Sequence, residues 1–313
     1  MTPDLERDGG RYAIRLPRVR SMNAESSDRP GEGEGETVFP VSNMLPNFLI
    51  IGAMRSGTTS LARYLGSHPD VFMAPQKEVH FFDRNFQRGA DWYRSQFRTS
   101  GAQLIGEATQ TYLFEATVPE RMATLVPEAR LIAILRDPVD RAYSHYLMNR
   151  EAGGESLTFM DALESESRRL ASGNPAATRT FSYVKRGLYL QQLLEVCRWF
   201  PRAQLHVMLF DDLRDRPAET YRSLCDWLGL VPFLPTNLGE QLNAHVRFRS
   251  VRVRRLAKRL PTVGRRAVGA LNTYRTPYDP MDPQLRRELK QLFSQPNERL
   301  ADWLNRDLSI WAD

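Results

Sequence analysis

Short apolar runs alternate along the chain with longer segments in which apolar residues recur every three or four positions. A short apolar run between turn residues is typical of a buried strand, and the three-to-four spacing is typical of an amphipathic helix. The predicted strands are 47–51, 71–74, 103–106, 129–135 and 205–210. The predicted helices are 58–67, 138–150, 156–170, 183–200, 216–228 and 283–304. Strands separated by helices predict an α/β fold, with a parallel sheet flanked by helices on both faces.

The first 43 residues do not share this alternation. They consist largely of Gly, Glu, Arg, Pro and Ser, and include the run Pro30-Gly-Glu-Gly-Glu-Gly-Glu36. A segment with so few large apolar groups cannot bury enough surface to order itself. We therefore expect a disordered leader over 1–43 and a single domain over 44–313.

Composition narrows the class of protein. With 313 residues, 42% of them hydrophobic, the chain can build a large core, which excludes a disordered, collagen-like or disulfide-scaffold protein. No run of 18 apolar residues or secretory signal is visible, so we expect neither a membrane span nor secretion. Cys197 and Cys225 lie in apolar contexts without metal-ligand spacing. We interpret them as buried thiols in a reducing, cytoplasmic location, and we expect no metal site.

Positive charge is concentrated in one segment. Residues 241–278 hold ten basic and no acidic residues, and subtracting ten from the net charge of +6 leaves −4 on the rest. The pattern predicts a basic helical segment over 247–275, which could act as a flap over an acceptor. A solvated amphipathic helix and contact of 247–266 with an anionic membrane are open alternatives. The chain is not generally basic, so no nucleic-acid partner is expected.

A glycine-containing turn joins the first predicted strand to the first helix. Gly52 and Gly57 have the spacing G-x-x-x-x-G, and Arg55, Ser56, Thr58, Thr59 and Ser60 complete the turn. Backbone N–H groups and a helix N-terminus in this setting form a nest for an anion, although a turn without a ligand is the alternative. Thr58 stands where a Walker A loop carries Lys, so a single 5′-phosphate suits the loop better than a metal-bridged triphosphate.

Arg136 and Ser144 form a second candidate constellation. Arg136 ends the strand 129–135, at the edge of the sheet where open α/β proteins bind ligands. Asp137 is a suitable helix N-cap and Pro138 a suitable first helical residue, so Ser144 falls on the following helix. Arg136 and Ser144 could clamp a second phosphate. The alternative is an ordinary ion pair of Arg136 with Asp137 or Asp140.

These segments together resemble the PAPS-dependent sulfotransferases, in particular the heparan-sulfate group and its bacterial relatives. The resemblance rests on 48–61, 77–83 and 135–146, with weaker similarity at 185–189, 200–201, 210–213 and 280–308, and spans roughly 46–312. It implies a P-loop-type sheet, with the first loop (Arg55 to Ser60) on the 5′-phosphosulfate of 3′-phosphoadenosine 5′-phosphosulfate (PAPS). It also implies that Arg136 and Ser144 hold the 3′-phosphate, and that the product is adenosine 3′,5′-bisphosphate (PAP). The chain departs from the family at Arg55 and Ala108, where Lys is usual.

Sulfuryl transfer requires a base, and Glu78 is the candidate that the resemblance implies. We expect apolar neighbours to raise the pKa of Glu78, although a solvated Glu78 paired with Lys77 is the alternative. His80 lies two residues on, so in an extended segment it faces the same side as Glu78 and could orient it. A purely structural His80 is an equal possibility.

The sequence thus predicts a sulfotransferase that moves a sulfuryl group from PAPS to a hydroxyl, or secondarily an amine. The acceptor could be a glycan, a lipid or a small molecule, because one sequence does not define the shapes of the loops around a substrate. Two other classes remain open: a P-loop nucleotide kinase or ATPase, and a non-enzymatic module that binds membrane or nucleic acid.

Overall fold

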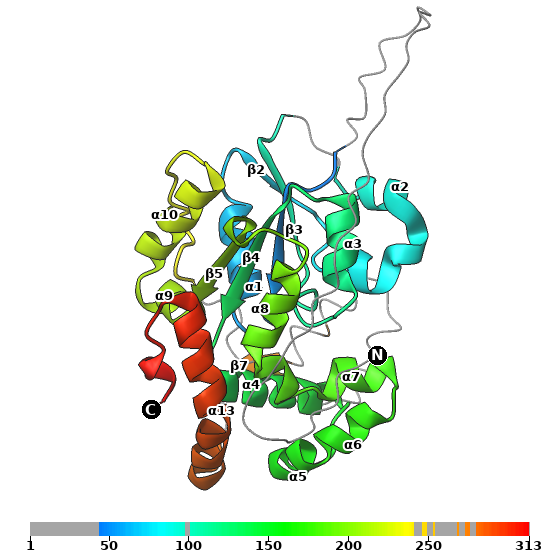
Figure 1. Ribbon diagram of the computed structural model, residues 1–313, viewed down its shortest axis with the longest axis vertical. Coiled ribbons are helices and arrows are strands. Elements are labelled where there is room, and N and C mark those ends of the chain that lie inside the picture. The colour runs from blue at the N-terminus through cyan, green and yellow to red at the C-terminus, as the bar shows by residue number, and fades with distance from the viewer. Residues whose placement is uncertain are drawn as a thin grey trace, which may run out of the picture. The chain divides into compact units, whose positions relative to one another are not determined.

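In the computed structural model, a five-stranded parallel sheet forms the core of the unit that spans residues 42–313 (Figure 1). The structure describes residues 44–97, 101–240, 246–248, 253, 268, 273–275 and 280–312. The strands are β1 (Phe48–Gly52), β2 (Val71–Met73), β3 (Leu104–Ala108), β4 (Arg130–Leu135) and β5 (Leu205–Leu209), in the order β2-β3-β1-β4-β5. After β1 the chain crosses to the edge strand β2 and returns through β3, whereas after β4, which neighbours β1 on the other side, it continues away to β5. The connections that follow β1 and β4 therefore leave in opposite directions, so the carboxyl ends of these two strands form a topological switch point. Ligands bind at the carboxyl ends of the strands at such a point.

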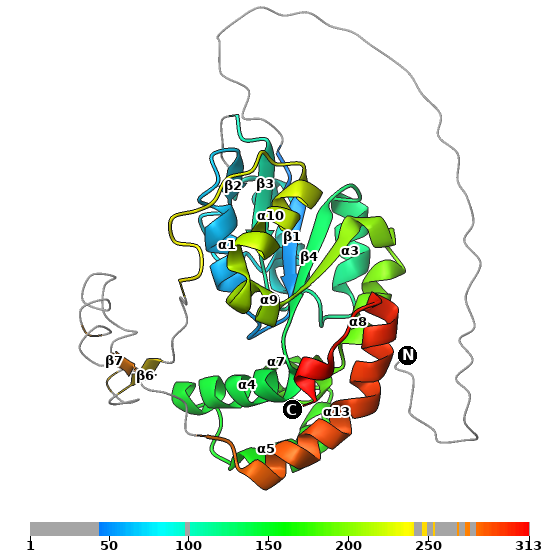
Figure 2. The same ribbon diagram turned by 90° about the vertical axis from the view of Figure 1, so that its left-hand side faces the viewer.

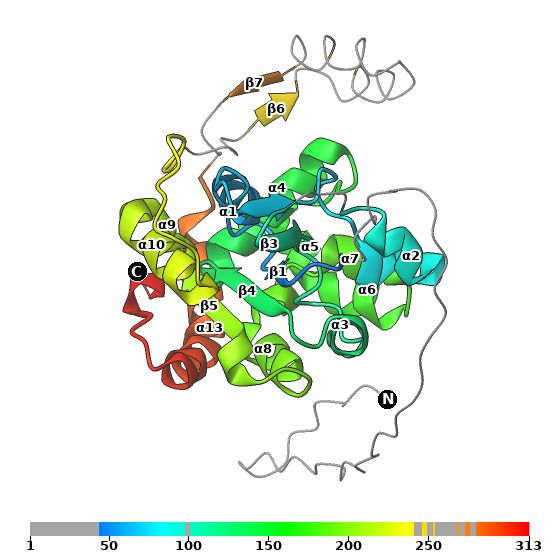
Figure 3. The same ribbon diagram turned by 90° about the horizontal axis from the view of Figure 1, so that it is seen from above.

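Helices cover both faces of this sheet, as the alternating pattern predicted. On one face pack α1 (Thr58–Leu65) and α10 (Pro217–Leu228). On the other pack α3 (Val118–Leu125), α8 (Tyr189–Cys197) and the end of α13 (Pro283–Leu304). Figures 2 and 3 show α1 and α10 on one side of the strands and α3 and α8 on the opposite side.

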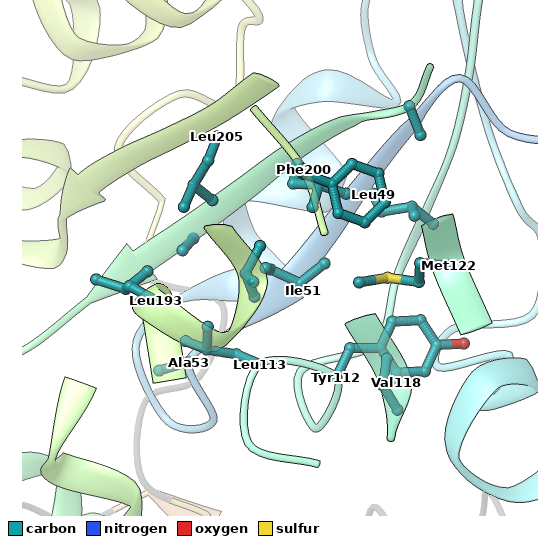
Figure 4. Close-up of a cluster of buried hydrophobic side chains, with 14 of the residues drawn as sticks. Leu49, Ile51, Ala53, Tyr112, Leu113, Val118, Met122, Leu193, Phe200 and Leu205 are labelled. Carbon is teal, nitrogen blue, oxygen red and sulfur yellow. The ribbon is translucent and has the colours of Figure 1, made fainter. Parts of the chain in front are cut away.

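The central strand is buried on both faces. Leu49 and Ile51 of β1 face the α3–α8 side, where Met122 and Phe200 pack around them (Figure 4). The alternate residues of β1 pack against α1 and α10. Successive side chains of a strand point to opposite faces, so an uninterrupted apolar run is what a strand covered on both faces requires.

A third group of helices lies beyond the carboxyl ends of the strands. Helix α4 (Pro138–Ala152) runs across these ends and α13 packs beside it (Figure 2). Asp137 caps α4 as predicted, because its carboxylate accepts hydrogen bonds from the backbone N–H groups of Val139 and Asp140 at 2.7 and 3.1 Å. The part of the chain that the structure describes also contains the α-helices α2 (Gly89–Arg94), α5 (Phe159–Glu164), α6 (Glu166–Ala171), α7 (Pro175–Phe181) and α9 (Phe210–Asp215). Short helical turns are η1 (Phe81–Asn85), η2 (Phe86–Arg88), η3 (Lys185–Gly187), η4 (Arg202–Gln204) and η5 (Ser309–Trp311).

Several predicted elements differ from the structure. The helix expected over 156–170 is two short helices that meet at Ser165, and the helix expected from residue 183 begins at Tyr189. Helices α2, α3, α7 and α9 were not predicted. Helices of six to eight residues are marginal on their own and depend mostly on tertiary packing. Cys225 is buried as expected, whereas Cys197 is only half-buried.

The basic segment is not helical where it begins. Val246–Phe248 forms strand β6, which pairs antiparallel with β7 (Thr273–Arg275). Alternating β-branched and aromatic residues at 246–248 suit a strand, so the helical prediction from residue 247 was wrong there. Val253 is helical, and most of 249–272 lies outside the described residues.

Residues 42–313 form one compact unit. The leader predicted over 1–43 lies outside the described residues. Within the part of the chain that the structure describes, no helix has the length and apolar character needed to cross a bilayer.

Candidate active site

The loop between β1 and α1 presents the amino end of a helix at the carboxyl edge of the sheet. Arg55 and Gly57 have left-handed backbones, with φ of 70° and 95°. A side chain on Gly57 would begin 3.0 Å from the ring of Phe210, so glycine suits both the conformation and the space. Helix α1 starts at Thr58 and no side chain caps it. Its first N–H groups therefore have no capping side chain as acceptor, and such a helix N-terminus suits an anion.

Arg55 joins this loop to helix α4. Its Nε donates a hydrogen bond to Ser144 Oγ at 3.0 Å, and its Nη1 lies 3.8 Å from the sulfur of Met148. Arg136, at the end of β4, donates from Nη1 to the backbone carbonyl of Arg55 at 3.4 Å. The two constellations predicted separately from the sequence, Arg55 with its loop and Arg136 with Ser144, thus form one continuous group.

A pocket opens beside this group, between α4 and the start of α13. It is lined by Arg136, Asp140, Tyr143, Ser144, Pro280, Met281 and Arg286. The ion pair that the sequence left open as an alternative is also present, because Arg136 Nη2 lies 3.7 Å from Asp140 Oδ2. Asp137 has different partners: it caps α4 and accepts from Lys290 Nζ at 2.7 Å. Arg136 therefore faces a pocket while it is paired with a half-exposed carboxylate, which is a weak interaction that a ligand can replace.

Glu78 lies in the loop after β2, beside the carboxyl end of β3. Its backbone N–H donates to the carbonyl of Ala108, the last residue of β3, at 3.2 Å. Its carboxylate accepts from Gln110 Nε2 at 2.8 Å and lies 3.4 Å from His80 Nε2 and 3.6 Å from Lys77 Nζ. Strand β3 pairs with β1, whose end forms the phosphate loop. Glu78 and that loop therefore occupy adjacent positions at the same edge of the sheet.

His80 contacts Glu78, although not for the reason predicted. The segment is not extended: Glu78 and His80 both have left-handed backbones, with φ of 58° and 54°. His80 Nδ1 lies 3.0 Å from a carboxylate oxygen of Asp83, and Thr111 Oγ1 donates to the same oxygen at 2.7 Å. The imidazole thus bridges two carboxylates.

This bridge reverses the expected protonation of the pair. Burial alone would lower the pKa of His80, but hydrogen bonds to Asp83 and Glu78 outweigh it and raise that pKa to about 9. The hydrogen bond from His80 lowers the pKa of Glu78 against the effect of burial. The expectation of a raised pKa for Glu78 was wrong, because a cation beside a carboxylate favours its charged form. At neutral pH the site therefore holds an ionised Glu78 beside an imidazolium.

The arrangement can accept a proton at Glu78 and can hold anions at the loop and at Arg136. Residue 108, at the end of β3, is a buried alanine and so supplies no cation to the site. Ser56 and Thr58 are buried, whereas Thr59 and Ser60 are half-buried on the first turn of α1. Among the described residues, no group of three His, Cys, Asp or Glu side chains is arranged to hold a metal ion.

Sequence reasoning missed three residues of this cluster: Asp83, Gln110 and Thr111. Asp83 follows His80 by three positions, the spacing of neighbours on a helical turn, and the turn η1 does begin at Phe81. That signal was available but was overlooked because the segment was interpreted as extended. Gln110, which contacts Glu78, and Thr111, which contacts His80, come from the loop after β3, about thirty positions away, and no local pattern connects them to these partners.

Comparisons with known proteins agree with this geometry. The family model for the sulfotransferase domain matches residues 45–296. The human bifunctional heparan sulfate N-deacetylase/N-sulfotransferase 2 is 33% identical over 204 residues, which are 61% of this chain and 22% of that protein. Mouse heparan sulfate glucosamine 3-O-sulfotransferase 3B1 is 35% identical over 234 residues, which are 69% of this chain and 58% of that protein. The chain thus spans less than two thirds of the length of either relative.

A solved structure shares the fold. The crystal structure of a sulfotransferase from Alicyclobacillus acidocaldarius superposes with a TM-score of 0.68 at 29% identity, covering 86% of this chain and all of that one. The family match extends over most of the described residues, including the loop after β1, the Glu78 cluster and the start of α4. The chain therefore belongs to the sulfotransferase domain family, whose members are enzymes that transfer sulfuryl groups.

Proposed function

We propose that this enzyme transfers a sulfuryl group from PAPS to a hydroxyl group of its acceptor, with Glu78 as the general base. The hydrogen bond between Arg55 and Ser144 carries the proposal, because it joins the phosphate loop to the pocket beside Arg136. A donor with one phosphate group at each end of a nucleoside needs two anion sites that lie next to each other, as the phosphate loop and this pocket do. The uncapped start of α1 would hold the 5′-phosphosulfate, and Arg136 and Ser144 would hold the 3′-phosphate.

The transfer step balances without any further reactant. The acceptor oxygen forms a bond to sulfur while the bond between sulfur and the 5′-phosphate oxygen breaks. The acceptor proton moves to the Glu78 carboxylate, and PAP leaves with the electron pair on its phosphate oxygen. Charge develops on that phosphate, so a fixed cation beside it lowers the barrier. Arg55 is the cation of the loop, and its hydrogen bond to Ser144 holds it in place.

Within this proposal His80 orients the base. Its imidazolium lies between Glu78 and Asp83 and is protonated at neutral pH, so it cannot itself accept the acceptor proton. Glu78 is ionised and can. Because its pKa is lowered, Glu78 remains available as a base well below neutral pH.

The acceptor class is tested first with carbohydrates, since the names of two relatives refer to heparan sulfate. Lipid and small-molecule hydroxyls form the second panel. Vesicles of anionic lipid, added to the same assay, would test contact of 247–266 with a membrane.

Calorimetry tests the donor. PAP should bind without a metal ion, and Mg·ATP should not compete; binding of Mg·ATP in its place would favour a kinase or ATPase and refute the proposal. Glu78→Gln tests the base: it should bind PAP as the wild type does but lose transfer of labelled sulfate. The exposed Glu128→Gln is the matched control and should remain active. Equal loss of binding and transfer in Glu78→Gln would show that Glu78 is structural.

A further inference from the structure

A carboxyl group lies fully buried behind the Glu78 cluster. Glu107 is on β3 and has no exposed surface. Its Oε1 accepts hydrogen bonds from the hydroxyls of Tyr93 at 2.6 Å and Tyr112 at 3.0 Å, and its Oε2 accepts from Thr109 Oγ1 at 2.8 Å. Burial raises the pKa of Glu107 to about 7, while the three hydroxyl donors oppose that rise. Burying such a group is costly unless its partners are in place.

The same hydroxyls also hold the main chain that carries His80. Thr109 Oγ1 accepts the backbone N–H of His80 at 3.3 Å. The Tyr112 hydroxyl accepts the N–H groups of Phe81 at 2.8 Å and Phe82 at 3.3 Å. These three N–H groups lie at the start of the turn η1, and the side chain at the N-cap, His80, does not accept a hydrogen bond from any of them.

Glu107 determines which way these hydroxyls point. A hydroxyl has one hydrogen, and those of Thr109 and Tyr112 are directed at the carboxylate. Their oxygen lone pairs are therefore free to receive the amides of residues 80–82. Tyr93 also contacts the turn directly, because its ring stacks on that of Phe81 with centroids 4.2 Å apart. The turn follows a left-handed His80 backbone, a conformation that persists only when its surroundings enforce it.

We propose that Glu107 is a positioning residue for sulfuryl transfer: through Thr109 and Tyr112 it fixes the turn that holds His80 against Glu78. This inference rests on the proposed function, in which Glu78 is the base. Glu107 contacts neither donor nor acceptor in this role. Its effect should appear in the transfer step and not in the binding of the donor, since the amides that Thr109 and Tyr112 hold belong to residues 80–82, whereas the donor is assigned to the loop after β1 and to Arg136.

Two substitutions of Thr109 test the inference with little change of volume. Thr109→Val removes the hydroxyl that links Glu107 to the His80 amide, and Thr109→Ser retains it. We expect Thr109→Val to lower kcat about 10- to 100-fold, the cost of misplacing a reacting group by a fraction of an ångström to one ångström. KM for PAPS and the Kd of PAP should remain as in the wild type, and Thr109→Ser should recover most of kcat.

Hydrogen exchange supplies a readout that does not depend on activity. In Thr109→Val the amide of His80 should exchange faster than in the wild type, and in Tyr112→Phe the amides of Phe81 and Phe82 should do so. Glu107→Gln should accelerate all three. If Glu107→Gln does not fold, the Thr109 pair and Tyr112→Phe still decide the question.

Three results would overturn the inference. These are an unchanged kcat in a folded Thr109→Val protein, a parallel loss of PAP binding and kcat, and a failure of Thr109→Ser to recover activity. A wild-type protein without any transfer from PAPS would instead refute the proposed function. In that case exchange at residues 80–82 would still report whether Glu107 anchors the turn.

Discussion

Replacing His80 by Gln should change how the stability of the protein depends on pH. In the structure the imidazole is held between Glu78 and Asp83, with contacts of 3.4 and 3.0 Å. Gln has a similar reach and can hydrogen-bond to the same carboxylates, but it carries no charge. The substitution therefore removes the titration of residue 80 while leaving much of the local packing in place.

The magnitude follows from the proton affinity of His80 in the two states. The folded protein raises the pKa of His80 from 6.5 to about 9, and each unit corresponds to about 1.4 kcal/mol, which gives about 3.4 kcal/mol as an upper value. Solvent screening at this partly accessible site reduces the expected effect to about 2 kcal/mol. A group whose pKa is raised on folding stabilises the protein below its unfolded pKa. That stabilisation is lost as the pH rises from 6.5 through about 9.

Denaturant unfolding of the wild type and of His80→Gln at about pH 6 and about pH 9.5 measures this effect. The difference in unfolding free energy between the two proteins should shrink by about 2 kcal/mol over that range. His206→Gln is the matched control. Burial lowers the pKa of His206 to about 4, so at about pH 6 only the unfolded state binds a proton at this residue. The difference for His206→Gln should therefore change by less than about 1 kcal/mol over the same range, and in the direction opposite to that of His80→Gln. A pH-independent difference for His80→Gln would refute the imidazolium between Glu78 and Asp83.

Three further substitutions test the donor site and the sheet. Arg136→Ala should weaken PAP binding about 10- to 100-fold, because a hydrogen bond to a charged group contributes about 1.5–3 kcal/mol. An unchanged Kd in calorimetry would contradict the role of Arg136 at the 3′-phosphate. Ser144→Ala should weaken PAP binding about fivefold, since it removes one neutral hydroxyl that also holds Arg55. A larger loss of affinity than in Arg136→Ala would show that Ser144, not Arg136, contributes most to the binding of the 3′-phosphate. Gly106→Ala would place a Cβ 2.2 Å from the Phe48 ring, so the free energy of unfolding should fall by about 3 kcal/mol in thermal or denaturant unfolding. Gly154→Ala is the control: its new Cβ would have its nearest neighbour at 3.7 Å, so the free energy of unfolding should change little.

Much of the fold was predictable because its signals are local. The apolar run in β1 and the three-to-four spacing in α1, α10 and α13 each act within one element, and the structure places these elements close to the predicted bounds. Local chemistry also marked the start of α4, where Asp137 precedes Pro138. Helices that depend on tertiary packing, such as α2 and α7, carried no such signal.

What the sequence determined by itself is the order of the elements and the identity of the chemical groups at the ends of the strands. Only the tertiary structure decided which of these groups meet. Arg55 reaches Ser144 across 89 positions, and Gln110 reaches Glu78 across 32. The direction of the Glu78 pKa shift depended on His80 and Asp83 closing into one cluster through left-handed backbones that no periodicity predicts. Propensity acts over a few neighbouring residues, whereas electrostatic interaction depends on distance in space, and that distance exists only once the chain has folded.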